Sequence, residues 1–209
     1  MRSLVLSLPL HPFDYVYLID LLRDYKSPRA KITQMLRSQE IIRVKKGLYV
    51  RSPEFGGQIN KWILSNLIYG PSYVSMESAL SFWGMIPEQT SQMTCMTNKR
   101  NRQFGTPVGV FTYHYLHSLP FSIGRTFEQV NQQPFLIATK EKALCDLLLT
   151  LPGHYKSREV PHVLEGDFRI DLEHLGSLDR SLLRAIQNAS SNAKVALFLR
   201  WYFKTYPES

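Results

Sequence analysis

The spacing of apolar residues is helical in two stretches of positions 14–39 and changes period after them, which predicts two helices and then strands. Residues 14–25 repeat apolar side chains at helical spacing, which predicts a first helix. Ser27 and Pro28 then supply a helix cap and a favoured first residue, so a second helix should begin there. Beyond that helix, apolar residues typical of strands, at 41, 42 and 44 and again at 48–50, flank a turn at residues 45–47, which predicts a β-hairpin.

The second predicted helix has one apolar and one basic side. Its apolar side is formed by Ala30, Ile32, Met35 and Leu36. Positions 29, 33 and 37 recur every four residues and share the outward face. A basic helix followed by a basic hairpin is the layout of a winged helix-turn-helix, in which the helix enters the major groove of DNA and the hairpin contacts the backbone. The predicted DNA-contacting residues are Arg29, Lys31, Thr33, Gln34, Arg37, Arg43, Lys45 and Lys46.

A helix followed by a hairpin with solvated lysines also occurs in α+β domains that bind no DNA. The distribution of charge favours the DNA interpretation. The chain has 25 Lys and Arg against 17 Asp and Glu, a net charge of +8. Residues 1–51 carry +6 of this charge, whereas residues 52–209 carry only +2. Cations concentrated on one module are expected when phosphate neutralisation supplies most of the affinity.

Composition places a domain boundary after the hairpin. The segment 51–57 contains a proline and two glycines, as is typical of a linker. We therefore expect an α+β chain with an N-terminal winged helix-turn-helix over 1–51, a linker over 52–57, and a larger mixed α/β domain over 58–209. In the larger domain we expect helices at 58–69, 75–83, 140–151 and through much of 171–206, and strands at 92–97, 109–115, 127–130 and 134–138.

Nothing in the sequence predicts a membrane span, a metal site or a nucleotide cofactor. No apolar run approaches the roughly 20 residues of a membrane span, and residues 1–13 lack a signal-peptide pattern, so we expect a short strand or arm there. Cys95 and Cys145 lie far apart and should be buried free thiols, which fits a reducing cytoplasm. His114 and His117 would lie on opposite faces of a strand, an arrangement unsuited to sharing a metal.

Four segments together resemble a known family. They read IIRVKKGLYV, YVSMESALSFWGMIPE, NRQFGTPVGVFTYHYL and FLIATKEKALCDLLL. In order and spacing, over roughly residues 14–150, they are similar to the AbiEi abortive-infection antitoxins of type IV toxin–antitoxin systems. The resemblance implies a winged helix that represses its own operon at inverted repeats in the promoter. It also implies a C-terminal domain that counteracts a nucleotidyltransferase toxin, with direct contact between the two left open.

One position departs from the family pattern. A glycine often closes the recognition helix in such sequences, and here that position is Gln39. Glutamine fits a left-handed cap poorly, so we expect this helix to run on or to end differently.

The larger domain offers one candidate partner surface. Lys99, Arg100 and Arg102 lie in a basic turn expected between two strands. Loops on a rigid scaffold often carry function, so this turn could contact an acidic partner, such as RNA or an acidic protein surface, and exert antitoxicity. The alternative is that it only adds solubility.

The alternative function is that of a metal-dependent, nuclease-like enzyme targeted to DNA by the winged helix. Its nearest candidate cluster is Lys140, Glu141, Lys142 and Asp146. A nuclease needs clustered carboxylates that hold a metal, with a lysine nearby. We favour instead a charged helix face over an apolar core, so no catalytic residue is predicted and the chain is expected not to be an enzyme.

Overall fold

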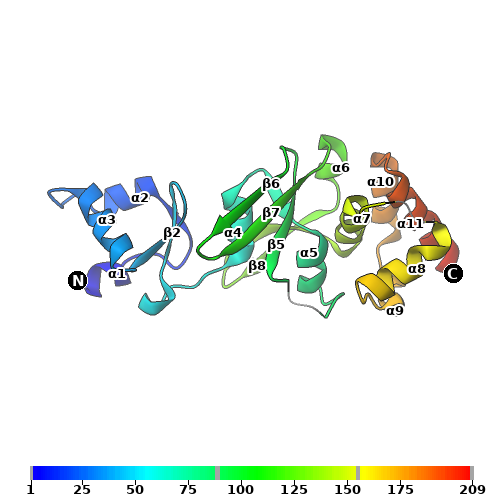
Figure 1. Ribbon diagram of the computed structural model, residues 1–209, viewed down its shortest axis with the longest axis horizontal. Coiled ribbons are helices and arrows are strands. Elements are labelled where there is room, and N and C mark those ends of the chain that lie inside the picture. The colour runs from blue at the N-terminus through cyan, green and yellow to red at the C-terminus, as the bar shows by residue number, and fades with distance from the viewer. Residues whose placement is uncertain (1, 88–89, 154–155, 208–209) are drawn as a thin grey trace.

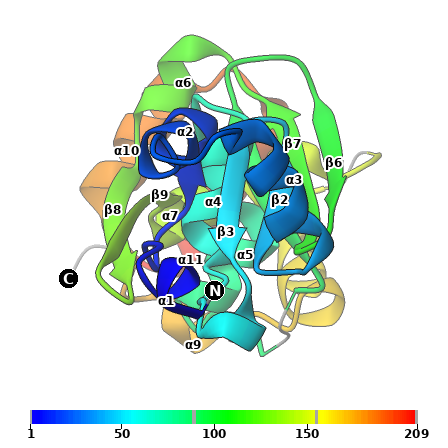
Figure 2. The same ribbon diagram turned by 90° about the vertical axis from the view of Figure 1, so that its left-hand side faces the viewer.

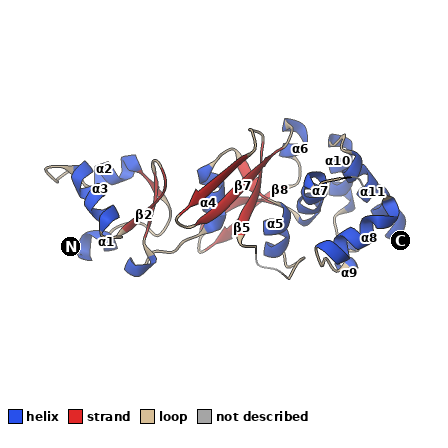
Figure 3. Ribbon diagram, in the orientation of Figure 1, coloured by secondary structure: helices blue, strands red, loops and turns tan. Residues whose placement is uncertain are grey.

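The computed structural model describes residues 2–87, 90–153 and 156–207. Figure 1 shows an elongated molecule with a small helical and β-hairpin part at the N-terminal end, a sheet in the middle and a group of helices at the C-terminal end. Figure 3 shows that the strands lie in the first two parts only. The fold is therefore a mixed α+β fold.

The N-terminal part joins three helices to a small antiparallel sheet. The sheet has the order β1-β3-β2. Its elements are α1 (Arg2–Leu6), β1 (Phe13–Asp14), α2 (Tyr15–Leu21), α3 (Pro28–Arg37), β2 (Ile41–Lys45) and β3 (Leu48–Arg51). The expected second helix and the hairpin are confirmed. Asp14 caps α2 by accepting a hydrogen bond from the Tyr17 backbone N–H at 2.8 Å, as its position before an apolar run predicts.

Three local expectations in this part are wrong. Residues 2–6 form a helix rather than a strand or arm, because Val5 and Leu8 bury their side chains in the small N-terminal core. The first predicted helix ends at Leu21 instead of residue 25, since the apolar spacing stops at the buried Leu22 and tighter turns follow. Ala30 is exposed because it lies two residues from the buried Ile32, on the other side of α3.

A six-stranded mixed sheet forms the middle of the molecule, with the strand order β6-β7-β5-β4-β9-β8. Its strands are β4 (Ser72–Val74), β5 (Gln92–Thr97), β6 (Arg102–Thr106), β7 (Gly109–Tyr115), β8 (Arg125–Val130) and β9 (Gln133–Ala138). The four expected strands are present, and β5 pairs with β7, in parallel. Strands β4 and β6 are not expected from the sequence, and Arg102 begins β6 rather than lying in the turn.

Helices cover the two faces of the six-stranded sheet. On one face lies α4 (Lys61–Ile68), where the Tyr113 hydroxyl donates to the Ser65 carbonyl at 2.7 Å. On the other lie α5 (Met76–Phe82) and α7 (Lys140–Thr150), where the Tyr73 hydroxyl donates to Asp146 at 2.9 Å. The remaining helices are α6 (Ser118–Ser122), α8 (Val160–His162), α9 (Leu172–Leu175), α10 (Arg180–Ala189) and α11 (Ala193–Thr205). Within the described ranges, no helix has both the length and the apolar character needed to cross a membrane.

The hairpin β2–β3 lies between two hydrophobic cores. Leu48 and Val50 belong to the larger core around the six-stranded sheet, whereas Tyr49, between them, belongs to the smaller N-terminal core. Alternate residues of a strand point to opposite faces, so β3 presents one face to each core. The segment 52–57, expected as a linker, contains a short 3-10 turn at Pro53–Phe55. The hairpin thus packs against the cores of both parts that the expected boundary separates.

The two cysteines are buried and free, as expected. Burial raises the pKa of the Cys95 thiol to about 12, and burial also raises that of Cys145 to about 12. Both side chains therefore act as small apolar groups of the larger core.

Candidate nucleic-acid interface

The sequence of α3 fixes where the helix begins and ends. Pro28 occupies the first turn, and Ser27 is the N-cap residue although its side chain makes no capping bond. At the other end the Gln39 backbone has φ 56°, in the left-handed region, and the Glu40 N–H donates to the Met35 carbonyl at 2.9 Å. The left-handed backbone of Gln39 and this hydrogen bond end the helix in the way that a glycine at the same position would. The expectation that Gln39 would make α3 end differently is therefore wrong.

The outward face of α3 presents the expected polar residues to solvent. Arg29, Thr33, Gln34 and Arg37 are exposed, while Lys31 is half-buried. The Lys31 ammonium donates to Gln34 Oε1 at 3.2 Å and lies 5.8 Å from the centre of the Tyr25 ring. The Thr33 hydroxyl donates to the Arg29 carbonyl at 3.0 Å. The side chains of the two arginines are exposed, and within the described ranges they form no ion pair.

The three cations of the hairpin have different environments. Arg43 and Lys46 are exposed. Lys45 is half-buried, and its ammonium donates to the carbonyls of Leu67 and Ile68, at 3.1 and 2.5 Å. A cation at this position binds the free carbonyls at the end of α4 and matches the helix dipole. Lys45 therefore joins the hairpin to α4 and is less available to phosphate than Lys46.

The basic loop of the larger domain also contacts the C-terminal end of α4. The Lys99 ammonium donates to the Gly70 carbonyl at 2.5 Å and lies 5.5 Å from the centre of the Tyr69 ring. Burial, and next the charge of Lys99, lower the pKa of Lys45. Arg100 and Arg102 are exposed. The structure therefore brings the hairpin and the loop of residues 98–101 together at the end of α4.

No carboxylate balances these cations in the part of the chain that the structure describes. The ion pairs there join Arg23 to Asp20, Lys142 to Asp146 and Arg158 to Glu159, and none involves a candidate cation. Such a surface is suited to a polyanion.

No known family model matches the chain. No curated protein sequence matches it either.

Glu141, Lys142 and Asp146 of the cluster considered for an enzyme are buried, and only Lys140 is exposed, so the expectation of a charged helix face is wrong. Lys142 and Asp146 are 2% and 1% exposed and form an ion pair at 2.6 Å. The other carboxylate oxygen of Asp146 accepts hydrogen bonds from the hydroxyls of Tyr73 and Ser75. Glu141 accepts a hydrogen bond from the Asp179 backbone N–H at 2.8 Å. These partners come from distant segments, which the spacing along the helix could not reveal.

Across the described ranges, no group of three or more His, Cys, Asp or Glu residues is arranged to hold a metal ion. His114 lies on β7, whereas His117 follows the strand and precedes α6.

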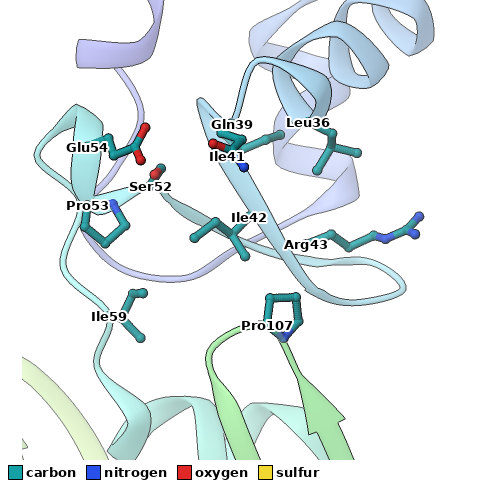
Figure 4. A pocket seen from close by; sticks show the side chains of 10 residues that line it. All are labelled: Leu36, Gln39, Ile41, Ile42, Arg43, Ser52, Pro53, Glu54, Ile59 and Pro107. Atoms are coloured by element: carbon teal, nitrogen blue, oxygen red, sulfur yellow. The ribbon is translucent and has the colours of Figure 1, made fainter.

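The structure also contains a cavity of about 600 Å³ that is not expected from the sequence. Figure 4 shows it between the hairpin, the segment 52–59 and the turn after β6, with Ile42, Ile59 and Pro107 around it. The Arg43 side chain extends away from it, toward solvent. In the sequence, the apolar Ile42 beside the basic Arg43 is a signal from which a contact between the hairpin and the larger domain could have been expected. The cavity lies where the N-terminal part meets the six-stranded sheet.

Proposed function

We propose that this chain is a DNA-binding repressor of the AbiEi antitoxin type. Its N-terminal part would act as a winged helix-turn-helix, with α3 in the major groove of a duplex and Lys46 and Arg43 on adjacent phosphates. The observation that carries the proposal is the exposed face of α3, with Arg29 and Arg37 unpaired by any carboxylate in the described chain. The sheet order β1-β3-β2, with α2 and α3 before the hairpin, supports it.

The repressor would bind inverted repeats in its own promoter. Two-fold sites need two protein copies, with half-sites spaced by whole helical turns of about 10 base pairs. The antitoxin role rests on the family resemblance, and its partner would be a nucleotidyltransferase toxin. Co-expression with a nucleotidyltransferase toxin tests this role through growth.

The observations favour a repressor over a nuclease-like enzyme. Both oxygens of the Asp146 carboxylate are engaged by protein side chains, and Glu141, Lys142 and Asp146 are buried. A metal-dependent nuclease needs carboxylates that are open to a metal and to substrate.

The test is binding of the full chain to labelled DNA from upstream of its own gene. Replacing Arg29 and Arg37 by alanine should weaken binding, by about 1–3 kcal/mol for each arginine that contacts a base. Replacing Arg200 and Lys204, two exposed cations of α11, removes the same charge at the far end of the molecule and serves as the control. Equal binding by both variants would contradict the proposal, and cleavage of the DNA in Mg²⁺ would favour the enzyme instead.

A further inference from the structure

Within the described ranges, one edge of the six-stranded sheet has no neighbouring strand. β8 ends the strand order β6-β7-β5-β4-β9-β8, so it pairs with β9 alone. Figure 2 shows β8 on the left, across the molecule from α3 and β2 on the right. An edge strand with free backbone groups is a template for pairing with another strand.

The turn between β8 and β9 fixes which backbone groups of β8 point outward. Asn131 and Gln132 both have positive φ, at 53° and 60°, as in the two-residue type I′ turn of a β-hairpin. The residues that flank such a turn, Val130 and Gln133, exchange both hydrogen bonds, and bonded pairs alternate with unbonded ones along the strands. Phe127 therefore lies in an unbonded pair, and its own N–H and C=O point away from β9.

The residue opposite Phe127 on β9 agrees with this alternation. Leu136 donates its backbone N–H to Asn66 Oδ1 at 2.6 Å, and its carbonyl accepts from the Asn66 amide at 3.3 Å. Both backbone groups of Leu136 thus point away from β8, as an unbonded pair requires. By the same alternation the backbone groups of Arg125 and Gln129 also point outward. No described residue forms a hydrogen bond with the outward groups of these three β8 residues.

The side chain at the centre of this edge is apolar and exposed. Phe127 is 74% exposed, the highest fraction among the large apolar residues of the described chain. Edge strands that avoid pairing commonly carry a lysine, a proline or a bulge. β8 has none of these, and its register with β9 runs without a shift. The edge is therefore suited to pairing with another strand.

The strand is complementary to a second copy of itself. When two β8 strands pair antiparallel about a two-fold axis at Phe127, the outward groups of Arg125 in one copy meet those of Gln129 in the other. The two Phe127 rings then lie opposite each other, and Thr126 lies opposite Glu128, where its hydroxyl can donate to the carboxylate. An axis at Glu128 would instead oppose two carboxylates, and an axis at Thr126 would leave half of the strand unpaired.

We propose that a second copy of this chain binds along β8, with Phe127 at the two-fold axis, so that the two six-stranded sheets form one continuous sheet. A second copy is the occupant that the strand itself specifies, because it supplies the ring opposite Phe127 and the hydroxyl opposite Glu128. α3 lies across the molecule and would stay exposed in such a dimer. The inference goes beyond the proposed function, since the association needs no DNA.

The test is sedimentation equilibrium of the full chain at concentrations up to about 100 µM, ten times a dissociation constant of about 10 µM. The wild type should form dimers. Phe127→Lys and Phe127→Glu should each be monomeric, because like charges would face each other across the axis. An equal mixture of these two variants should recover dimers, since each lysine then faces a glutamate. The matched control is Val16→Lys, at a side chain 72% exposed on α2, which should behave as the wild type.

A cross-linking experiment tests the register. Phe127→Cys should form an intermolecular disulfide under mild oxidation, because the Cα atoms of a bonded antiparallel pair are about 5.5 Å apart. Gln129→Cys should not, since its two copies would lie about 13 Å apart along the strands. The native cysteines are buried and free, so the wild type serves as the blank.

The remaining outcomes are decisive. A wild type that stays monomeric over the whole range would overturn the inference, as would dimers that survive Phe127→Lys. A mixture that stays monomeric would exclude the pairing of Phe127 with itself, whereas recovery shows that both variants are folded. If the wild type is monomeric and binds a nucleotidyltransferase toxin, and Phe127→Lys loses that binding, the edge belongs to the toxin. Failure of the full chain to bind DNA would overturn the repressor proposal alone.

Discussion

The Lys142 ammonium lies 2.6 Å from Asp146 Oδ1, one turn along α7 and inside the larger core. Tyr73 and Ser75 donate to the other carboxylate oxygen. Burial, and next the charge of Asp146, raise the pKa of Tyr73 well above its ordinary value, so its hydroxyl stays a donor. Burying two charges costs solvation, which their mutual attraction and these hydrogen bonds offset.

Replacing Asp146 by alanine should lower the free energy of unfolding by about 3–5 kcal/mol, because it leaves the Lys142 charge buried and unpaired. Asp146→Leu combined with Lys142→Met should recover much of this loss, since neither charge remains. Urea denaturation of the two variants measures the difference. A double variant as unstable as Asp146→Ala would show that packing, rather than the stranded charge, dominates.

Adjacent lysines of the hairpin should differ in their effect on stability. Lys45→Ala removes charged hydrogen bonds to the end of α4, which should cost about 1 kcal/mol after allowing for its partial exposure. Lys46 is exposed, so Lys46→Ala should change stability by less than about 0.5 kcal/mol. Chemical denaturation compares them directly. Equal effects would mean that the contact with α4 contributes nothing measurable.

Gln39→Gly should stabilise the protein by up to about 1 kcal/mol. Its backbone φ of 56° is costly for a residue with a side chain, and that cost exceeds the added freedom of the unfolded chain. Gln34→Gly, in the interior of the same helix, should instead cost about 1 kcal/mol. Thermal unfolding of both variants is the measurement. A loss of stability in both would argue against strain at Gln39.

Acid should weaken the fold through His114. Burial lowers its pKa below the ordinary value of 6.5, with the charge of Glu77 opposing the change. The unfolded chain therefore binds the proton more readily. Stability should fall as the pH drops through 6.5 toward the folded-state pKa, and should level off above that window. Urea midpoints between about pH 5 and 8 should show a shallower fall for His114→Gln, with the exposed His117→Gln as control. Identical profiles would exclude His114 as the cause.

Local signals in the sequence were sufficient for most of the longer helices and for four of the six strands of the larger sheet. Pro28 marks the start of α3, and the Thr139 side chain caps α7 by accepting from the Lys142 N–H. The edge strand β6 was missed because its residues are mostly exposed and polar, with a glycine inside, and it pairs on one side only. β4 was missed because its three residues are all buried, so they show no alternation.

For the candidate interface, the sequence predicted which basic residues are exposed but not the long-range contacts that some of them make. Exposure of Arg29 and Arg37 follows from helical spacing. The different roles of Lys45 and Lys46 depend on where α4 ends, 22 residues further along the chain. Burial of the Lys142–Asp146 pair likewise depends on Tyr73 and Ser75, which lie 73 and 71 residues from Asp146. Contacts of this kind leave no periodic pattern.

The two-sided burial of the hairpin limits how such a chain can be divided. A cut within residues 52–57, where composition suggests a boundary, would leave Leu48 and Val50 facing water beside the free edge of β2. An isolated N-terminal fragment would then tend to self-associate. A gene fusion that exchanged the second domain would need a new surface to cover these residues. Changes in operator specificity should therefore arise more easily by substitutions on the exposed face of α3 than by recombination of whole domains.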